Sequence, residues 1–328
     1  MNRTGYIQPI ERTMAQRSFD DAMFSTMGFF SDRSEGYLDK LPNKALTIEL
    51  ENQLIGKPAP RIWQQTGSCV GSAAANAQVK SMVGDIIIDG QELEGRLMPF
   101  AWGAYGRGRE LGGMNSKGEG SFGSVQAAAS MQAEFGMLAY DDPRVPQPEI
   151  VIDELGGRWF KYTKQEEIDW SYAPEWPIPY EELRKDSSPQ GFAKKTRIKS
   201  IEETQQAHAQ GYGVTIAAGY LEGGKVRPTD GLLISEFNDR GGHQQGIGGY
   251  LNHPSQGLLF EIDNNWGPEA HGRDDILAPL GVLGSYWIRA ERYEELLRDP
   301  QTEVFAVSSS GTWKTRPIAW DDVFSYYD

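Results

Sequence analysis

The sequence contains a single cysteine, and its position suggests a site for chemistry. Cys69 follows Gly67 and Ser68, and it precedes a run of small residues at 72–77. One thiol cannot form a disulfide within the chain, so either packing or reactivity must explain it. At the first turn of a helix, the peptide dipoles favour the thiolate over the thiol. Cys69 is therefore either a small buried hydrophobe in an alanine-rich helix or a nucleophile.

A histidine and an asparagine could complete a site around this thiol. His243 stands in a glycine-rich segment, 241–249, at the entry to an expected strand, where small neighbours leave room for the imidazole. Asn264 and Asn265 follow the next expected strand, and a side-chain amide there can orient a histidine ring. Trp266 could shield that hydrogen bond from water. Nucleophile, base and orienting group therefore all have candidates, as acyl transfer requires.

The other three histidines carry weaker signals. His208 lies on an expected polar helix and His253 lies in a turn, so both are expected at the surface. His271 precedes Asp274 and Asp275, and the three side chains together could hold a cation. Their spacing matches no metal motif, so a solvated loop is the expectation. The sequence predicts no metal site and no cofactor.

Hydrophobic periodicity divides the chain into a mainly helical first half and a mainly β second half. A glycine-rich loop, 112–120, lacks the Gly-Lys-Ser/Thr ending of a phosphate-binding loop. Helices are expected over 69–83, 99–109, 123–135 and 201–210. Strands are expected over 214–218, 245–251, 258–262, 285–288 and 304–307. This order predicts an α+β fold.

Three parts are expected along the chain. Residues 1–60 lack a long helical pattern, and we expect an extension or docking arm that binds the main body or a partner. Residues 61–310 form the expected main domain. Within it, the proline-rich stretch 141–200 indicates an irregular connection held by tryptophans, not a separate domain. Residues 311–328 form a C-terminal tail.

Composition disfavours several classes of partner. The formal net charge is -14, with 46 acidic and 32 basic side chains, which repels phosphate backbones and disfavours nucleic acid. No apolar stretch is long enough to span a bilayer, and the start of the chain lacks the apolar core of a secretory signal. A single cysteine suits a reducing compartment. We therefore expect a soluble protein in the cytoplasm or another reducing compartment, or in a virion.

Four segments, in order, resemble the papain-like cysteine proteases over roughly residues 62–290. Gln-Thr-Gly-Ser-Cys-Val-Gly at 65–71 is similar to the nucleophile motif of that family, and 120–123 is similar to its substrate-lining glycine loop. Gly-His at 242–243 resembles the segment that bears the base. Asn-Asn-Trp-Gly at 264–267 resembles the family's Asn-Ser-Trp-Gly. The resemblance implies a two-lobed fold, with a helical N-terminal lobe and an antiparallel β-sheet or barrel as the C-terminal lobe.

The same resemblance implies a thiol peptidase or related amide hydrolase with a Cys-His-Asn triad and a peptide or protein substrate. Cys69 would attack the acyl carbon, His243 would hold and return the proton, and Asn264 would fix the imidazole ring. Gln64 or Gln65 would donate to the oxyanion, together with the backbone N–H of Cys69. Substrate contacts would come from residues around the nucleophile, the glycine loop and the base, namely Gly67, Ser68, Gly118, Gly120, Gly242 and Trp266.

Some features depart from the family pattern. The oxyanion glutamine of the family usually lies six positions before the cysteine, where this chain has Trp63. Gln244 and Gln245 follow His243 where the family prefers small apolar residues, and no inhibitory propeptide is expected in 1–60. The alternative function is a papain-fold structural component of a larger assembly. In overall style the chain resembles proteins encoded beside the virion structural genes of tailed bacteriophages, which implies assembly partners bound through 1–60.

Overall fold

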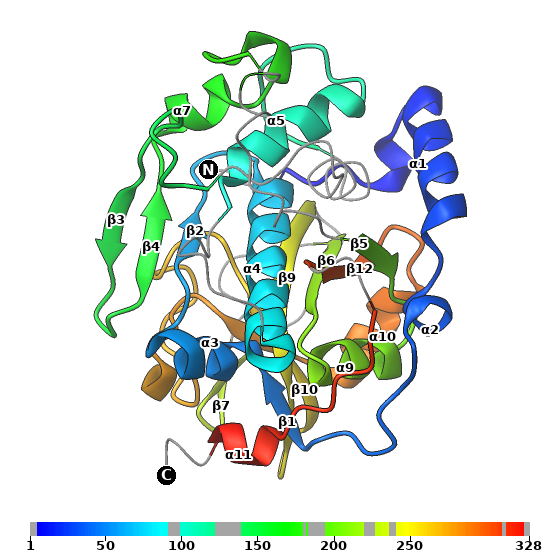
Figure 1. Cartoon of the computed structure of the whole chain (residues 1–328), viewed down its shortest axis with the longest axis vertical. Helices are drawn as coiled ribbons and strands as arrows, with labels where there is room; N and C mark the ends of the chain where they lie inside the picture. The colour runs from blue at the N-terminus through cyan, green and yellow to red at the C-terminus, as the bar shows by residue number, and fades with distance from the viewer. Residues whose placement is uncertain are drawn as a thin grey trace.

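The structure is a computed structural model that describes residues 5–90, 99–121, 139–179, 182, 194–219, 227–235, 241–309 and 313–324 (Figure 1). The helix expected over 123–135 lies outside these residues. The described helices before residue 180 are η1 (Pro9–Glu11), α1 (Met14–Met27), α2 (Phe30–Arg33), α3 (Thr47–Ile55), α4 (Cys69–Asp89), α5 (Ala101–Leu111), α7 (Lys164–Asp169) and η2 (Ala173–Glu175). After it come α9 (Ile201–Ala209), η4 (Ala278–Leu280), α10 (Ala290–Arg298) and α11 (Trp320–Phe324).

The long helix α4 runs through the middle of the molecule (Figure 1). Its first turns carry alanine, serine and glycine, which let neighbouring backbone approach closely. A side-chain carbon built on Gly213 would lie 1.8 Å from the carbonyl oxygen of Ala77, so strand and helix nearly touch there. Every residue from Cys69 to Asp85 is buried, and the helix ends at Gly90 in the left-handed conformation. The expected helix at 69–83 is therefore confirmed and runs further.

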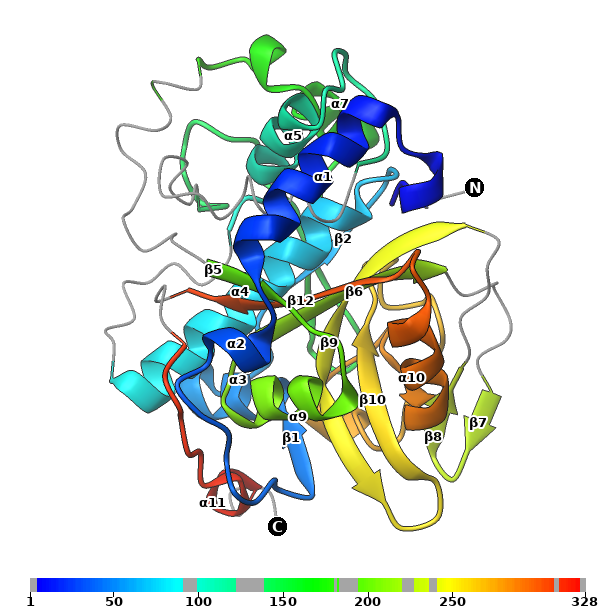
Figure 2. The ribbon, with the colours of Figure 1, turned by 90° about the vertical axis from the view of Figure 1, so that its right-hand side faces the viewer.

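A nine-stranded sheet packs against α4. Its central strands are β6 (Gly213–Gly219), β9 (Gly242–His253) and β10 (Gly257–Asp263), which pair antiparallel. The strand order is β5-β12-β6-β9-β10-β11-β8-β7, and β1 also pairs with β9. The outer strands are β1 (Lys44–Leu46), β5 (Lys194–Arg197), β7 (Arg227–Thr229), β8 (Leu232–Ile234), β11 (Tyr286–Arg289) and β12 (Glu303–Ser308). The helices α9 and α10 lie beside these strands, away from α4 (Figure 2).

The expected α+β class is confirmed, with helices before a largely antiparallel sheet. The barrel alternative is not observed: among the described residues, the strand path runs from β5 to β7 without closing. The β8–β11 pair is parallel, while the other pairs of this sheet are antiparallel. The five strands expected from the sequence correspond to β6, β9, β10, β11 and β12.

The first 60 residues contain more regular structure than their sequence pattern indicated. Helix α1 spans 14 residues and begins with a capping box at Thr13, so the expectation of no long helix was wrong. The strand β1 joins the main sheet through β9, and Leu46, Ile48 and Leu50 are buried in the core. This region therefore packs on the chain's own body, whereas a boundary at residue 60 stays a prediction.

Residues 141–200 are less irregular than expected. They include β3 (Glu149–Ile152) and β4 (Arg158–Lys161), which form a three-stranded sheet with β2 (Arg61–Trp63). The β2–β4 pair is parallel and joins segments far apart in the sequence. Local pattern could not reveal this pairing, because the partner strand is only three residues long and lies far away along the chain.

The C-terminal residues return to the core beside α4 and α9. Trp313 and Trp320 are buried, and the Trp320 indole donates to the carbonyl of Ala209 at 2.8 Å. Arg316 forms a buried ion pair with Asp85 of α4 and a second ion pair with the more exposed Asp89. No helix in the described part of the chain is long and apolar enough to cross a membrane.

Candidate active site

Cys69 is the first residue of α4, as the sequence suggested, and it is completely buried. The backbone N–H of Gln244 on β9 donates to its sulfur at 3.4 Å. Gln244 follows His243 in the chain, so the thiol lies against the strand segment that carries the candidate base. Tyr6, Val70 and Ala217 complete the apolar cluster around the sulfur.

The loop that leads to Cys69 is held by a buried carboxylate from α7. Glu167 accepts hydrogen bonds from the backbone N–H of Gln65 at 2.7 Å, the Thr66 hydroxyl at 2.5 Å and the Ser68 hydroxyl at 3.2 Å. Burial raises the pKa of Glu167 to about 7, although these donors oppose the shift. This one side chain fixes the turn that delivers the thiol.

Gly67 is held from the opposite direction by the glycine loop. Its N–H donates to Glu119 at 2.9 Å, and its carbonyl accepts from the Tyr105 hydroxyl at 2.9 Å and from the N–H of Gly120 at 3.0 Å. Gly118 also belongs to this loop, and its N–H donates to the Ser171 hydroxyl at 2.9 Å. The expected residues Gly67, Ser68, Gly118 and Gly120 therefore lie on one connected stretch beside Cys69.

The strand register brings His243 and Asn264 together. β9 and β10 pair so that Gly246 lies opposite Asp263, which sets the ends of both strands side by side. The His243 Nε2 lies 3.2 Å from Asn264 Oδ1, and Trp266 stacks on the imidazole at 4.7 Å between ring centroids. Nδ1 of His243 is buried and has no hydrogen-bond partner among the described residues.

The neighbouring Asn265 has a different role. Its side-chain oxygen accepts from Asn76 of α4 at 2.8 Å, and its carbonyl accepts from the N–H of Gln64 at 2.9 Å. Asn265 thus ties the end of β10 to α4, while Asn264 contacts the histidine.

Neither glutamine considered for the oxyanion presents its amide to open space. Gln64 is buried, and its Nε2 donates to the carbonyl of Thr66 at 3.0 Å. The Gln65 Nε2 donates to the carbonyl of Trp63 at 3.1 Å. Each side chain therefore folds back onto its own loop, and either amide would have to turn before it could donate to a substrate.

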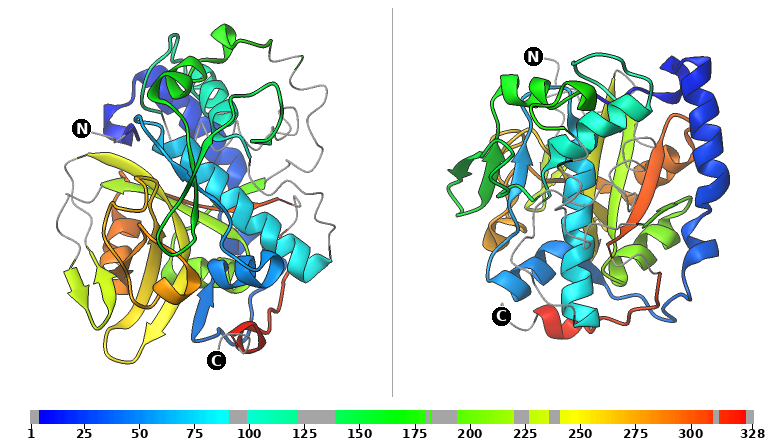
Figure 3. Two further views of the ribbon diagram at one scale, coloured as in Figure 1. Left: turned by 90° about the vertical axis from the view of Figure 1, so that its left-hand side faces the viewer. Right: turned by 45° about the horizontal axis from the view of Figure 1, so that its top comes forward.

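Backbone near the N-terminus passes directly over Cys69. The N–H of Tyr6 donates to the carbonyl of Gly242 at 3.3 Å, while the Ser121 N–H donates to the carbonyl of Gly5 at 2.6 Å. A side-chain carbon on Gly5 would lie 1.7 Å from the Gly67 carbonyl oxygen. Figures 2 and 3 show this blue segment beside the end of the yellow strand β9. The segment thus occupies the space between the expected substrate-binding residues Gly67, Gly120 and Gly242.

A buried charge cluster anchors this N-terminal segment, which we define as residues 5–12. The Tyr6 hydroxyl donates to Glu303 of β12 at 2.9 Å. Arg12 donates to both oxygens of Glu303, at 2.9 and 2.8 Å, and pairs with Asp20 at 2.6 Å. Arg12, Asp20 and Glu303 are all buried. The contacts with Arg12 hold the pKa of Glu303 below its usual range, against the effect of burial.

Burial keeps both candidate reacting groups neutral. It raises the pKa of the Cys69 thiol to about 11, although backbone N–H groups from Gln244 and Gly5 oppose the shift. It lowers the pKa of His243 to about 4, although the Asn264 contact opposes it. The expectation of a thiolate at the start of α4 therefore does not hold for this covered state, because removal of water outweighs the helix dipole.

Of two other histidines, His208 differs from its sequence expectation and His271 has a contact that the sequence did not predict. His208 on α9 is completely buried, not at the surface, and burial lowers its pKa to about 3. His271 is partly buried, and its Nε2 lies 2.6 Å from Asn264 Nδ2. Its loop is solvated on both sides, with Glu269, Gly272 and Arg273 exposed. The described residues contain no cluster of metal-binding side chains.

The sequence reasoning missed Glu167, Glu303 and His271. Glu167 belongs to a capped helix of acidic residues that looks solvated, and Glu303 begins an ordinary strand. His271 follows Trp266 by only a few residues, which was the one local signal of its proximity to Asn264.

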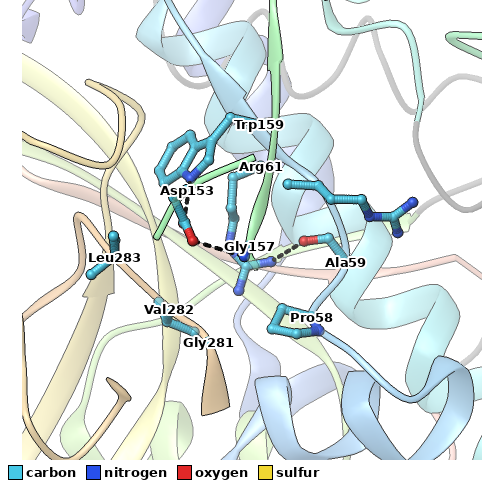
Figure 4. Close-up of a pocket in the computed structure, with 10 residues that line it drawn as sticks. Pro58, Ala59, Arg61, Asp153, Gly157, Trp159, Gly281, Val282 and Leu283 are labelled. Carbon is cyan, nitrogen blue, oxygen red and sulfur yellow. Dashed lines mark hydrogen bonds between the residues drawn. The ribbon is translucent and has the colours of Figure 1, made fainter. Parts of the chain in front are cut away.

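A separate pocket lies at the junction of β2, β4 and the loop after η4 (Figure 4). Asp153 accepts from the Trp159 indole at 3.0 Å and from the N–H of Gly157 at 2.8 Å. Arg61 donates to the carbonyl of Ala59 at 3.1 Å. None of the residues predicted for the active site lines this pocket.

Solved structures show which fold this is. The chain matches xylellain, a cysteine protease from Xylella fastidiosa, with a TM-score of 0.55 and 16% identity, over 93% of this chain and 96% of that one. It also matches procathepsin B S9 from Trypanosoma congolense, with a TM-score of 0.48 and 12% identity over 91% of both chains. The cysteine protease and lectin-like domains of Cwp84 from Clostridium difficile match with a TM-score of 0.48 and 13% identity, over 91% of this chain and 60% of that one.

No family model matches the sequence, and no curated protein matches it either. The likeness to xylellain establishes the fold of papain-like cysteine proteases for this chain. At 16% identity it establishes the fold alone.

Proposed function

We propose that this protein is a thiol peptidase or related amide hydrolase that uses Cys69, His243 and Asn264. The observation that supports this best is the junction of α4 and β9, where the Cys69 sulfur contacts the residue next to His243 and His243 contacts Asn264. Nucleophilic acyl transfer needs a nucleophile, a base and a group that orients the base, and a thiol, an imidazole and an amide can fill these three roles.

The reaction would begin with transfer of the Cys69 proton to Nδ1 of His243. That nitrogen has no other hydrogen-bond partner among the described residues, while Nε2 is committed to Asn264. The sulfur would then attack the carbonyl carbon, and the imidazolium would return the proton to the leaving amine. Water would hydrolyse the resulting thioester, again with His243 as the base.

The oxyanion would accept a hydrogen bond from the backbone N–H of Cys69 at the start of α4. A second donor would come from Gln64 or Gln65, after release from the carbonyl of Thr66 or Trp63. Loss of one such donor typically lowers the rate constant about a hundredfold or more.

The N-terminal segment would have to leave before turnover. It covers the thiol and binds the backbone of Gly242 and Ser121, two groups that a peptide substrate could otherwise contact. The full chain would therefore show little activity until residues 5–7 move away. This differs from the expectation that no inhibitory segment would be found in 1–60.

Activity can be tested in a chain whose N-terminal segment is displaced. Gly5→Val should push the segment out, because its side chain would overlap the Gly67 carbonyl oxygen. We expect this variant to cleave unfolded protein substrates, and we expect Gly5→Val with Cys69→Ser to cleave none. Mass spectrometry of the products would locate the bonds that are cut. Iodoacetamide reactivity no greater than that of a model thiol, together with no Cys69-dependent cleavage, would overturn the proposal.

A structural role in a larger assembly, such as a phage virion, is the second candidate. One observation favours a partner: Ile150 and Ile152 of strand β3 are more than half exposed, at 53% and 58%. Apolar side chains on a strand at the edge of a sheet are typical of contact surfaces. Substituting both with Asp should prevent incorporation into such an assembly and leave Cys69 reactivity unchanged. Unchanged incorporation would exclude this surface.

A further inference from the structure

We propose that His271 is a positioning residue: by accepting from Asn264 Nδ2 it helps to hold the amide with its oxygen facing His243. This inference rests on the proposed function for its effect on rate, but its geometric core can be tested without turnover. It would extend the chain of contacts from Cys69 through His243 and Asn264 to a second histidine.

The Asn264 amide has three neighbours, and each one restricts it. Its Oδ1 lies 2.8 Å from the backbone N–H of Asn265 and 3.2 Å from His243 Nε2. A backbone N–H can only donate, so the atom beside it must be the amide oxygen. The Nδ2 atom therefore faces His271 Nε2, which lies 2.6 Å away.

These restrictions fix the protons on both rings. An amide nitrogen can only donate, so His271 Nε2 must accept and its proton must lie on Nδ1. Asn264 Oδ1 can only accept, so the proton of neutral His243 must lie on Nε2. Nδ1 of His243 then carries the lone pair that would receive the thiol proton. His271 thus favours the tautomer that the reaction needs.

The surroundings of His271 suit an acceptor that stays neutral. The Trp266 ring lies 6.0 Å from it and also stacks on His243, so one indole contacts both imidazoles. Tyr286 of β11 meets the His271 ring edge-on at 4.8 Å, and its hydroxyl donates elsewhere, to Gln245. Burial lowers the pKa of His271 to about 4, so the ring is neutral at pH 7.

The first test reads the ring protons directly. The chain has four histidines, so the ring nitrogens of a ¹⁵N-histidine sample can be assigned by substituting each in turn. At pH 7 we expect His271 Nε2 to be unprotonated and His243 Nε2 to be protonated. In a chain labelled with ¹⁵N throughout, a coupling across the hydrogen bond should also join Asn264 Nδ2 to His271 Nε2. A protonated His271 Nε2 in the unmodified chain would overturn the proposal, whether or not any variant folds.

The second test compares His271→Gln with His271→Leu in the displaced Gly5→Val background. Glutamine can accept from Asn264 Nδ2, whereas leucine has a similar size and no acceptor. We expect His271→Leu to lower kcat about tenfold with KM within about twofold, and His271→Gln to retain kcat within about threefold. His253→Leu serves as a control, because in the described structure the hydrogen bonds of the His253 side chain stay within its own turn and none reaches the candidate active site.

The outcomes separate this inference from the proposed function. Equal kcat for the Leu and Gln variants would overturn the positioning role. If the Gly5→Val chain shows no hydrolysis and its Cys69 reacts with iodoacetamide no faster than a model thiol, the proposed function fails. The NMR comparison then decides the inference alone: a mixture of His243 tautomers in His271→Leu but not in His271→Gln supports it, and identical spectra for His243 overturn it.

Discussion

The two sides of the Cys69 site are held in different ways. On the α4 side, the turn at 64–68 depends on side chains from other elements, chiefly Glu167 and Tyr105. On the β side, His243 and Asn264 follow from the ladder between β9 and β10, with Trp266 and His271 packed beside them. In a β-ladder, many backbone hydrogen bonds hold the two strands in register, so no single side chain is essential. A turn held by one carboxylate depends on that carboxylate.

The N-terminal segment joins these two sides. It binds Ser121 next to the α4 side and Gly242 on the β side, and its anchor is the buried Glu303. We therefore expect different effects from substitutions that loosen the N-terminal segment, the α4 side or the link between the two sides, and we expect these effects to decrease in that order.

The largest effect should come from Arg12→Ala. Removing one partner of a buried ion pair typically costs about 3–5 kcal/mol, which should raise the open fraction of the segment by about a hundredfold or more. Because only open molecules expose the thiol, the alkylation rate of Cys69 should rise by the same factor. The exposed Lys40→Ala is the control for loss of a positive charge. Equal alkylation rates in Arg12→Ala and in the unmodified chain would mean that the anchor does not govern access.

The pH dependence of Cys69 alkylation should also depend on whether the N-terminal segment covers the thiol. Burial raises the pKa of Cys69 to about 11 in the covered state, above the ordinary value of 9.0. The covered state therefore binds the thiol proton more tightly than the open state does. The resulting stabilisation of the covered state over the open state is complete below pH 9.0 and is lost as the pH rises towards 11. Alkylation rates measured from pH 6 to 11 should give a lower apparent pKa for Arg12→Ala than for the unmodified chain. Superimposable profiles would contradict burial by the segment as the cause.

A smaller effect is expected from Glu167→Ala in the displaced Gly5→Val background. Three hydrogen bonds to the turn before Cys69 would be lost. We expect kcat/KM to fall about tenfold, which corresponds to about 1.4 kcal/mol of transition-state stabilisation. Peptide hydrolysis assays would measure this, with the exposed Glu154→Ala as the matched control. If the two variants had equal kcat/KM, the turn would not depend on Glu167.

The smallest effect on rate should come from Asn76→Ala, which cuts the link between α4 and Asn265. The Asn76–Asn265 bond is buried, so its loss should lower the free energy of unfolding by about 1–3 kcal/mol. Activity should stay within about threefold, because Asn264 keeps its own contacts. Urea unfolding monitored by tryptophan fluorescence would measure the change, with the exposed Asn115→Ala as the control. An unchanged midpoint would show that the ladder alone aligns the two sides.

Much of the fold could be predicted because its signals are local. Helix α4 was visible in its small residues, strands β6 and β10 in their apolar runs, and β9 in a glycine-rich segment that ends in Tyr250 and Leu251. Helix α1 was missed because its apolar residues alternate with many polar ones. The three-stranded sheet was missed because β2 and β4 are short and far apart along the chain.

The sequence by itself determined the residue types available for chemistry and their order along the chain: one thiol, an imidazole after glycine and an amide before tryptophan. Only the tertiary structure decided that residues 5–7 cover the thiol, that Glu167 holds its turn, and that His271 reaches the Asn264 amide. Motifs record local spacing. These other contacts join elements separated in sequence, and long-range packing leaves no periodic trace along the chain.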